Sequence, residues 1–222
     1  MSLYLLHLET CTKMCSVAIS DNGKIVDCIE NDTDNYIHGE YLTVFIEEIL
    51  AKNQLLPNQL AGVSVSSGPG SYTGLRIGLS VAKGLCFALS IPLISVSTLK
   101  VLALLGKEKY PNSTLVPMLD ARRNEVYCEI FDQELNSIKP LSADILDDKS
   151  YQNFEPFIYF GDGAEKMSTQ WENRNIMFDG SIKLSAKGQV AMAYEKFNQN
   201  KFEDIAYFTP LYLKEFMIEG KK

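Results

Sequence analysis

The chain has 222 residues, of which 46% are hydrophobic and 22% charged, so it can form one large α/β domain or two small lobes and is not of the disordered type. Its net charge of −7, with no basic stripe, argues against nucleic-acid binding driven by the chain's own cations. The longest apolar run, Gly84 to Val96, is interrupted by Ser90 and Pro92 and is shorter than the about 20 residues of a membrane span. We therefore expect a cytoplasmic protein with no membrane contact.

The first half of the chain predicts the order β-β-β-α-β-α-β-α. An Asp21-Asn22-Gly23 hairpin turn and helical spacing of apolar residues after residue 39 support this order. The expected strands are Leu3–Thr10, Cys15–Ser20, Lys24–Glu30, Ala61–Ser66 and Pro92–Val96, and the expected helices are Gly39–Asn53, Thr73–Leu89 and Ser97 or Thr98 to about Leu105. A strand meander that feeds βα crossovers forms a mixed sheet with helices against it. By fold-level analogy, this is one lobe of an actin/Hsp70-like protein.

The second half repeats this order more weakly. The segment Gly106–Ser113 is expected to be a linker, followed by strands at Leu115–Asp120, Glu125–Asp132 and Phe157–Gly161 and helices at Gly163–Gln170 and Ala186–Asn198. The predicted fold is therefore α/β and actin/Hsp70-like (ASKHA, ribonuclease H-like), with two lobes and mixed sheets. We place the N-terminal lobe at residues 1–106 and a smaller, degenerate lobe at residues 107–222.

A glycine-rich turn, Ser67–Gly78, joins a buried strand to the second helix. Glycines allow other atoms to approach the backbone closely, Ser71 or Thr73 can cap the helix, and helix N-termini favour anions. The turn matches neither the Walker A motif nor the GxGxxG spacing. A tight structural turn is the favoured interpretation, and a ligand cradle is the alternative.

The helix after this turn carries a row of small residues. Gly74, Gly78 and Ala82 recur every four residues, and Cys86 continues the row. Such a row permits close approach of another helix, and the remaining faces are also mostly apolar. The pattern predicts contacts on two sides, with the sheet on one side and with a neighbouring helix, a partner chain or both on the other.

The chain has few of the groups that an ATPase of this fold needs. The first hairpin turn, Glu9–Cys15, and the second, Asp120–Glu125, both lack the glycines that grip phosphates. Glu9 and Asp120 could pair across a cleft, where a structural role is favoured over magnesium binding. With His7 and His38 as the only histidines and no nucleophile elbow, hydrolase chemistry is not supported.

Taken together, these residues resemble the TsaB (YeaZ) family, bacterial subunits needed to make threonylcarbamoyladenosine at position 37 of certain tRNAs. The resemblance rests on Leu-His-Leu-Glu-Thr and Cys-Ser-Val-Ala-Ile in the first strands, His38, Pro92, Ser97-Thr98, Asp120–Tyr127, Gly161–Ala164, and Pro210-Leu-Tyr-Leu. Its most specific part is the signature loop, formed by Ser67, Gly68, Pro69, Gly70, Ser71, Thr73, Gly74, Arg76 and Gly78.

The resemblance implies a non-catalytic subunit without cofactor or metal. It implies pairing with a TsaD-type paralogue, or with a second copy, through the first two long helices, with a TsaE-type ATPase joining and tRNA reached only indirectly through the complex. The expected interface residues are Tyr41, Phe45, Glu48, Gly74, Leu75, Gly78, Leu79, Ala82, Lys83 and Cys86.

Two departures bear on this expectation: Glu9 stands where the family usually has Asp, and Tyr72 replaces the commoner Phe. His38 is alone where the catalytic paralogue holds a metal with two histidines, which fits a degenerate relative. The competing hypothesis is an active ATP-dependent phosphotransferase or carbamoyl-transferring enzyme that uses Glu9 and Asp120. A protease is the weakest alternative.

Overall fold

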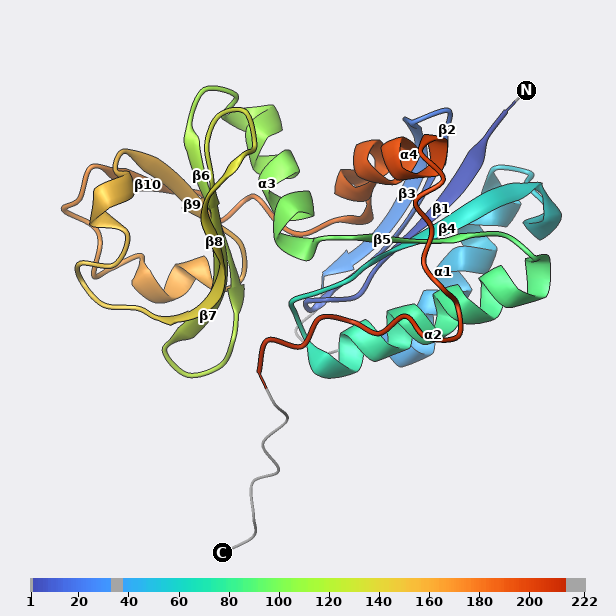
Figure 1. The fold of residues 1–222 in the computed structure, drawn as a ribbon, viewed down its shortest axis with the longest axis horizontal. Coiled ribbons are helices and arrows are strands. Elements are labelled where there is room, and N and C mark those ends of the chain that lie inside the picture. Colours follow the sequence, from blue (N-terminus) through green and yellow to red (C-terminus); the bar gives the residue numbers. More distant parts are fainter. Residues whose placement is uncertain (1, 33–37, 215–222) are drawn as a thin grey trace, which may run out of the picture.

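The computed structural model describes residues 2–32 and 38–214, which form two five-stranded sheets with helices between and around them (Figure 1). The first sheet contains β1 (Tyr4–Glu9), β2 (Met14–Asp21), β3 (Lys24–Asp32), β4 (Leu60–Ser66) and β5 (Leu93–Val96). The second contains β6 (Thr114–Asp120), β7 (Glu125–Phe131), β8 (Ser137–Ile145), β9 (Phe157–Phe160) and β10 (Ile176–Phe178). The helices are α1 (His38–Lys52), α2 (Tyr72–Leu89), α3 (Thr98–Lys109) and α4 (Val190–Asn198), with short 3-10 helices η1 (Pro57–Gln59), η2 (Gln152–Phe154), η3 (Ala164–Met167) and η4 (Ala186–Gln189).

The two sheets have the same topology. Their orders are β3-β2-β1-β4-β5 and β8-β7-β6-β9-β10, each an antiparallel meander extended by two parallel strands. A duplicated mixed sheet of this kind is the arrangement predicted from the order of elements in the sequence. The predicted actin-like two-lobe fold is thereby confirmed.

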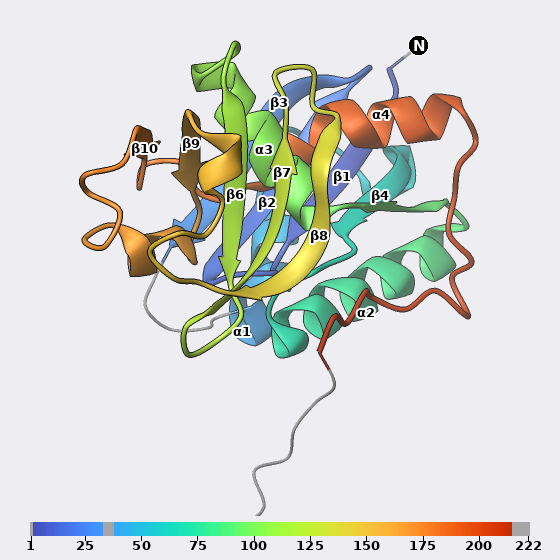
Figure 2. The same ribbon diagram turned by 60° about the vertical axis from the view of Figure 1, so that its left-hand side comes forward.

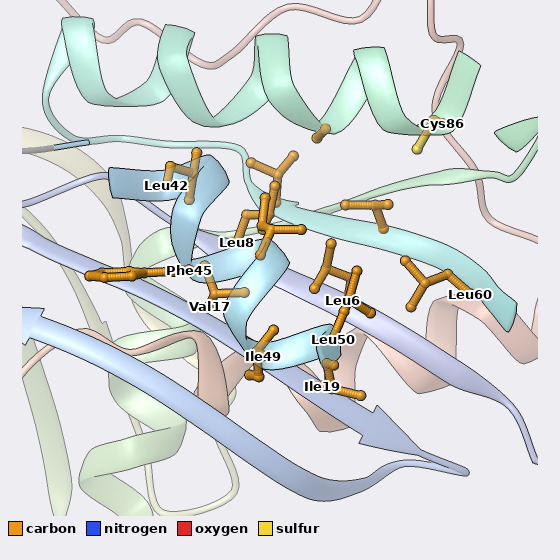
Figure 3. Close-up of a cluster of buried hydrophobic side chains, with 14 of the residues drawn as sticks. Leu6, Leu8, Val17, Ile19, Leu42, Phe45, Ile49, Leu50, Leu60 and Cys86 are labelled. Atoms are coloured by element: carbon orange, nitrogen blue, oxygen red, sulfur yellow. The ribbon is translucent and has the colours of Figure 1, made fainter. Parts of the chain in front are cut away.

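Helices α1 and α2 cover one face of the first sheet. Because side chains alternate along a strand, Leu6 and Leu8 of β1 face these helices, whereas Leu5 faces the other side. Figure 3 shows Phe45 of α1 and Cys86 of α2 directed into this core, together with leucine, isoleucine and valine side chains from the sheet. The pair of helices therefore has one face in the core and one toward solvent.

Helix α3 lies between the two sheets, and α4 covers the second face of the first sheet (Figure 2). The chain reaches α4 only after β10, so it returns to the first sheet at the end of its path. It then runs along α2 as an extended segment, residues 203–214, which we name the strap. By its contacts this stretch belongs with the first sheet, although the expected division at residue 106 places it in the second lobe.

Other differences from the predicted elements are local. The expected linker Gly106–Ser113 begins inside α3, because the helix continues through a polar last turn whose Lys107 and Lys109 suit a helix C-terminus. Strand β8 was not expected, since it contains Pro140 and most of its apolar residues are exposed. The expected helix Gly163–Gln170 is only the 3-10 turn η3, and the expected helix Ala186–Asn198 is η4 followed by α4.

The structure also shows the state of the cysteines and the length of the apolar helices. All five cysteines are free thiols, and burial raises the pKa of Cys15, Cys28 and Cys86 to about 11. Within residues 2–32 and 38–214, no helix is both long and apolar enough to cross a bilayer.

Candidate functional site

The signature loop closes onto the β1–β2 turn. The amide of Ser71 donates to the carbonyl oxygen of Cys11 (2.7 Å), and the Thr10 hydroxyl donates to the carbonyl oxygen of Gly74 (2.7 Å). A Cβ at Gly70 would lie 2.8 Å from Cys11, and one at Gly74 would overlap the carbonyl oxygen of Thr10. The glycines are therefore needed for close packing of α2 on this turn, which supports the interpretation as a structural turn.

The row of small residues on α2 faces the sheet and not a partner. Gly74 and Gly78 pack on Thr10, and Ala82 and Cys86 are fully buried in the core. The expectation that this row contacts another chain is thus wrong, because the sheet already occupies it. Leu75, Leu79 and Phe45 are buried as well.

The solvent side of α1 and α2 presents a different set of side chains. Tyr41 of α1 is 42% exposed, and Glu48 is exposed on the same side of this helix. On α2 the exposed positions include Gly84, with no atom within 4 Å of the place of a Cβ, and Phe87, which is 81% exposed. Exposed aromatic side chains are enriched at protein–protein interfaces.

Charges divide this surface into two halves. Helix α1 exposes Glu40, Glu47 and Glu48, whereas α2 has no acidic residue and contributes Lys83. Arg76 of α2 lies at the border of this surface, where its guanidinium contacts Tyr212 of the strap. A second molecule of the same fold can place its basic α2 against the acidic α1 of the first, and the reverse, about a two-fold axis. We name this surface, formed by the solvent sides of α1 and α2, the α1/α2 face.

The strap borders the α1/α2 face. The amide of Leu211 donates to the carbonyl oxygen of Ser67 (2.8 Å), and the ammonium of Lys83 donates to the carbonyl oxygen of Ala206 (3.4 Å). A Cβ at Gly68, whose φ is +102°, would lie 2.7 Å from the carbonyl oxygen of Leu211. One glycine of the signature loop thus serves the strap, which fixes the position of this segment beside α2.

Behind the signature loop, Glu9 is fully buried in a polar network. Its carboxyl accepts from the hydroxyl of Ser66 and from the amide of Cys11 (2.8 Å), and the amide group of Gln189 lies against it at 3.3 Å. Burial raises the pKa of Glu9, although these hydrogen bonds act in the opposite direction. The buried carboxyl of Glu9 is therefore surrounded by hydrogen-bonding groups of the chain itself.

His7 continues the network. Its Nδ1 lies 2.7 Å from the hydroxyl of Ser64, which donates to the side-chain oxygen of Gln189 (2.6 Å), and its Nε2 lies 2.8 Å from the hydroxyl of Ser20. Because Ser64 uses its proton for Gln189, His7 is protonated at Nδ1. Burial lowers the pKa of His7 to about 3, so the ring is neutral at physiological pH.

Glu9 and Asp120 are not brought together. Asp120 is exposed and forms an ion pair with Lys166 (2.5 Å), while Glu9 is enclosed within the first lobe. His38 is directed at the carbonyl oxygen of Thr12 (2.7 Å) through Nε2. In the described part of the chain no three His, Cys, Asp or Glu side chains gather as a metal site. The residues present do not fit the two-histidine metal site of the catalytic paralogue.

Two contributors to the site were missed by sequence reasoning. Gln189 fills the space beside Glu9 from 180 residues away, and nothing in its local sequence indicates such a role. The strap carries the Pro210-Leu-Tyr-Leu motif, which is part of the family resemblance. Its sequence does not indicate that Tyr212 contacts Arg76 of α2.

The duplicated sheets, with the β1–β2 turn packed under α2, define a protein of the actin-like fold. Comparison with known proteins agrees. The family TsaD, described as tRNA N6-adenosine threonylcarbamoyltransferase, matches residues 35–217. The chain belongs to this family and, within it, to the TsaB (YeaZ) group.

The relatives named TsaB differ in how much of them is matched. The Escherichia coli tRNA threonylcarbamoyladenosine biosynthesis protein TsaB is 25% identical over 95% of this chain and 94% of its own length. The TsaB of Haemophilus influenzae is 37% identical over 57% of this chain, and the match spans about half (52%) of that relative. The chain's fold is similar to YeaZ from Pseudomonas aeruginosa, with a TM-score of 0.79, 24% identity and coverage of 95% of this chain and 100% of that one.

Proposed function

We propose that the chain is a non-catalytic subunit that pairs with a TsaD-type paralogue and supports threonylcarbamoylation of adenosine 37 in tRNA. A TsaE-type ATPase is the third component of the proposed complex. The observation that carries the proposal is the enclosed Glu9, whose carboxyl is occupied by Ser66, Cys11 and Gln189. A catalytic site for magnesium and nucleotide would need an accessible acid at this position, and Glu9 is buried. We therefore assign the chain a binding role.

The α1/α2 face is the proposed docking surface. Its exposed Tyr41 and Phe87 offer the aromatic anchors that interfaces favour, and its acidic and basic halves complement a partner of the same fold. Of the residues expected at the interface, Tyr41, Glu48 and Lys83 reach this face, and the buried ones support the helices from below. Pairing with a second copy through the same face is the alternative outcome of the test.

The proposal is tested by Gly84→Trp, which adds a large side chain to the face where the Cβ position has open space. The matched control is Ala191→Trp, an exposed position on α4. We expect Gly84→Trp to weaken pairing with the paralogue at least about tenfold, as interface hot spots commonly do, while the control pairs normally. Size-exclusion chromatography with light scattering, with and without the paralogue, gives the readout. Normal pairing of a folded Gly84→Trp protein would overturn this assignment of the interface.

A further inference from the structure

The arginines of this chain are unevenly distributed. Of the four, Arg174 forms an ion pair with Glu155 (2.7 Å) in the second lobe. The other three, Arg76, Arg122 and Arg123, lie where α2, the strap and the β6–β7 turn meet. We name this region, defined by these three residues, the arginine surface.

Two of its members occupy an unfavourable turn. Arg122 and Arg123 have φ values of +69° and +52°, in the left-handed region that glycine or asparagine adopts more readily. Both side chains are exposed, and within residues 2–32 and 38–214 neither guanidinium makes a hydrogen bond or an ion pair. Strained residues that present unpaired side chains cluster at functional sites.

The carboxylates beside this turn already have partners within the chain. Asp120 pairs with Lys166 (2.5 Å), and Glu125 pairs with Lys214 of the strap. Asp162 accepts from the backbone amide of Asp120 (3.0 Å). The positive charges of the two arginines are therefore left available for an anion from outside the chain.

Aromatic rings lie beside the third arginine. The guanidinium of Arg76 is 3.9 Å from the ring centre of Tyr72, its Nε donates to the hydroxyl of Tyr212 (3.3 Å), and the two rings are 4.8 Å apart. Lys214, two residues after Tyr212, donates to the carbonyl oxygen of Ala121 (3.1 Å), which ties this stack to the β6–β7 turn. Cations interleaved with half-exposed aromatic rings are typical of surfaces that receive RNA, where bases stack on rings and guanidinium planes.

We infer that the arginine surface binds the phosphodiester backbone of tRNA in the assembled complex. Guanidinium groups match phosphate oxygens with paired hydrogen bonds, and the aromatic stack distinguishes this surface from one that meets only an acidic protein. The inference rests on the proposed function, which brings tRNA to the complex, and it replaces the expectation of purely indirect contact. With a net charge of −7 the chain alone is a poor RNA binder, so the contact adds to phosphate contacts made by the partner.

The test compares Arg122→Gln/Arg123→Gln with Lys24→Gln/Lys100→Gln, which removes the same charge at exposed positions outside this surface. Binding of an unmodified, fluorescently labelled tRNA transcript is titrated at several salt concentrations, once with the complex formed with the paralogue and once with the chain alone at low salt. In the complex we expect the arginine variant to lose about tenfold in affinity, and the slope of log K against log salt to shrink by about 1.5 for two lost phosphate contacts. The chain alone should show the same ranking of variants at low salt.

Each outcome has a distinct meaning. Equal affinity and slope for the two double variants would overturn the inference. So would a loss of paralogue binding by the arginine variant, which would assign the surface to an acidic protein, or a selective loss of ATP binding, which would assign it to free nucleotide phosphate. Failure of the wild-type chain to pair with the paralogue would instead refute the proposed function, and the low-salt titration of the chain alone would still decide the inference.

Discussion

At the scale of single residues, the glycines of α2 have opposite roles that their sequence context does not distinguish. Gly74 is packed against the backbone of Thr10, whereas Gly84 faces open space. We expect Gly74→Ala to lower the free energy of unfolding by about 1–3 kcal/mol through overpacking. Gly84→Ala should leave it unchanged or raise it by up to about 1 kcal/mol, because alanine is the better helix former. Urea denaturation of the two variants measures the difference, and equal stabilities would show that the tight contact with Thr10 does not constrain position 74.

His7 is a second residue whose effect can be measured in isolation. Its pKa is about 3 in the folded chain and near 6.5 in the unfolded chain, so the unfolded state binds more protons between these values. Stability from His7 is therefore complete above pH 6.5 and is lost as the pH falls toward 3, by about 2 kcal/mol at pH 5. His7→Gln should reduce the difference in unfolding free energy between pH 7 and pH 5 by this amount. Glu9, whose raised pKa acts in the opposite direction, is present in both proteins and cancels in the comparison.

At the scale of elements, the strap alternates between core and solvent. Phe208 packs against the core under α2, while its neighbour Tyr207 is 83% exposed. We expect Phe208→Ala to lower the free energy of unfolding by about 2 kcal/mol, less than a fully buried phenylalanine would, and Tyr207→Ala to change it by no more than about 0.5 kcal/mol. Thermal or urea unfolding of the two variants is the measurement. Similar values for both would mean that the strap does not contribute to the core.

The elements that sequence reasoning located best are those with strong local periodicity. The spacing of apolar residues predicted α1 and α2 to within one residue at most ends, and strand alternation predicted the first meander. The spacing of apolar residues predicted that α2 is apolar on most of its faces, but it did not predict which face packs against the sheet. The small row Gly74, Gly78 and Ala82 was assigned to a partner, whereas the sheet requires it, because the β1–β2 turn approaches at Thr10. Which face of a helix is inside depends on such distant contacts.

At the scale of the whole molecule, the order of elements predicted the duplicated sheet. It did not predict that the end of the chain returns to the first sheet. The segment from η4 through α4 to the strap returns from the second sheet to the first and supplies Gln189 beside Glu9. Local propensity carries no information about a contact between residues 180 positions apart. The second lobe was also harder to divide, since β8 is an exposed edge strand with little hydrophobic alternation.

The return of the chain gives the last prediction, which concerns nucleotide binding by the isolated protein. Ser66 and Gln189 contact the buried carboxyl of Glu9, whereas Asp120 is exposed and paired with Lys166, so we expect the two acids not to act on one metal ion. We expect calorimetric titration with ATP and magnesium to show no micromolar binding by the isolated chain, and Glu9→Gln and Asp120→Asn to give the same result. A micromolar, magnesium-dependent signal that both substitutions abolish would favour the phosphotransferase hypothesis. Binding that persists in both variants would place nucleotide elsewhere and leave the enclosed Glu9 without a catalytic role.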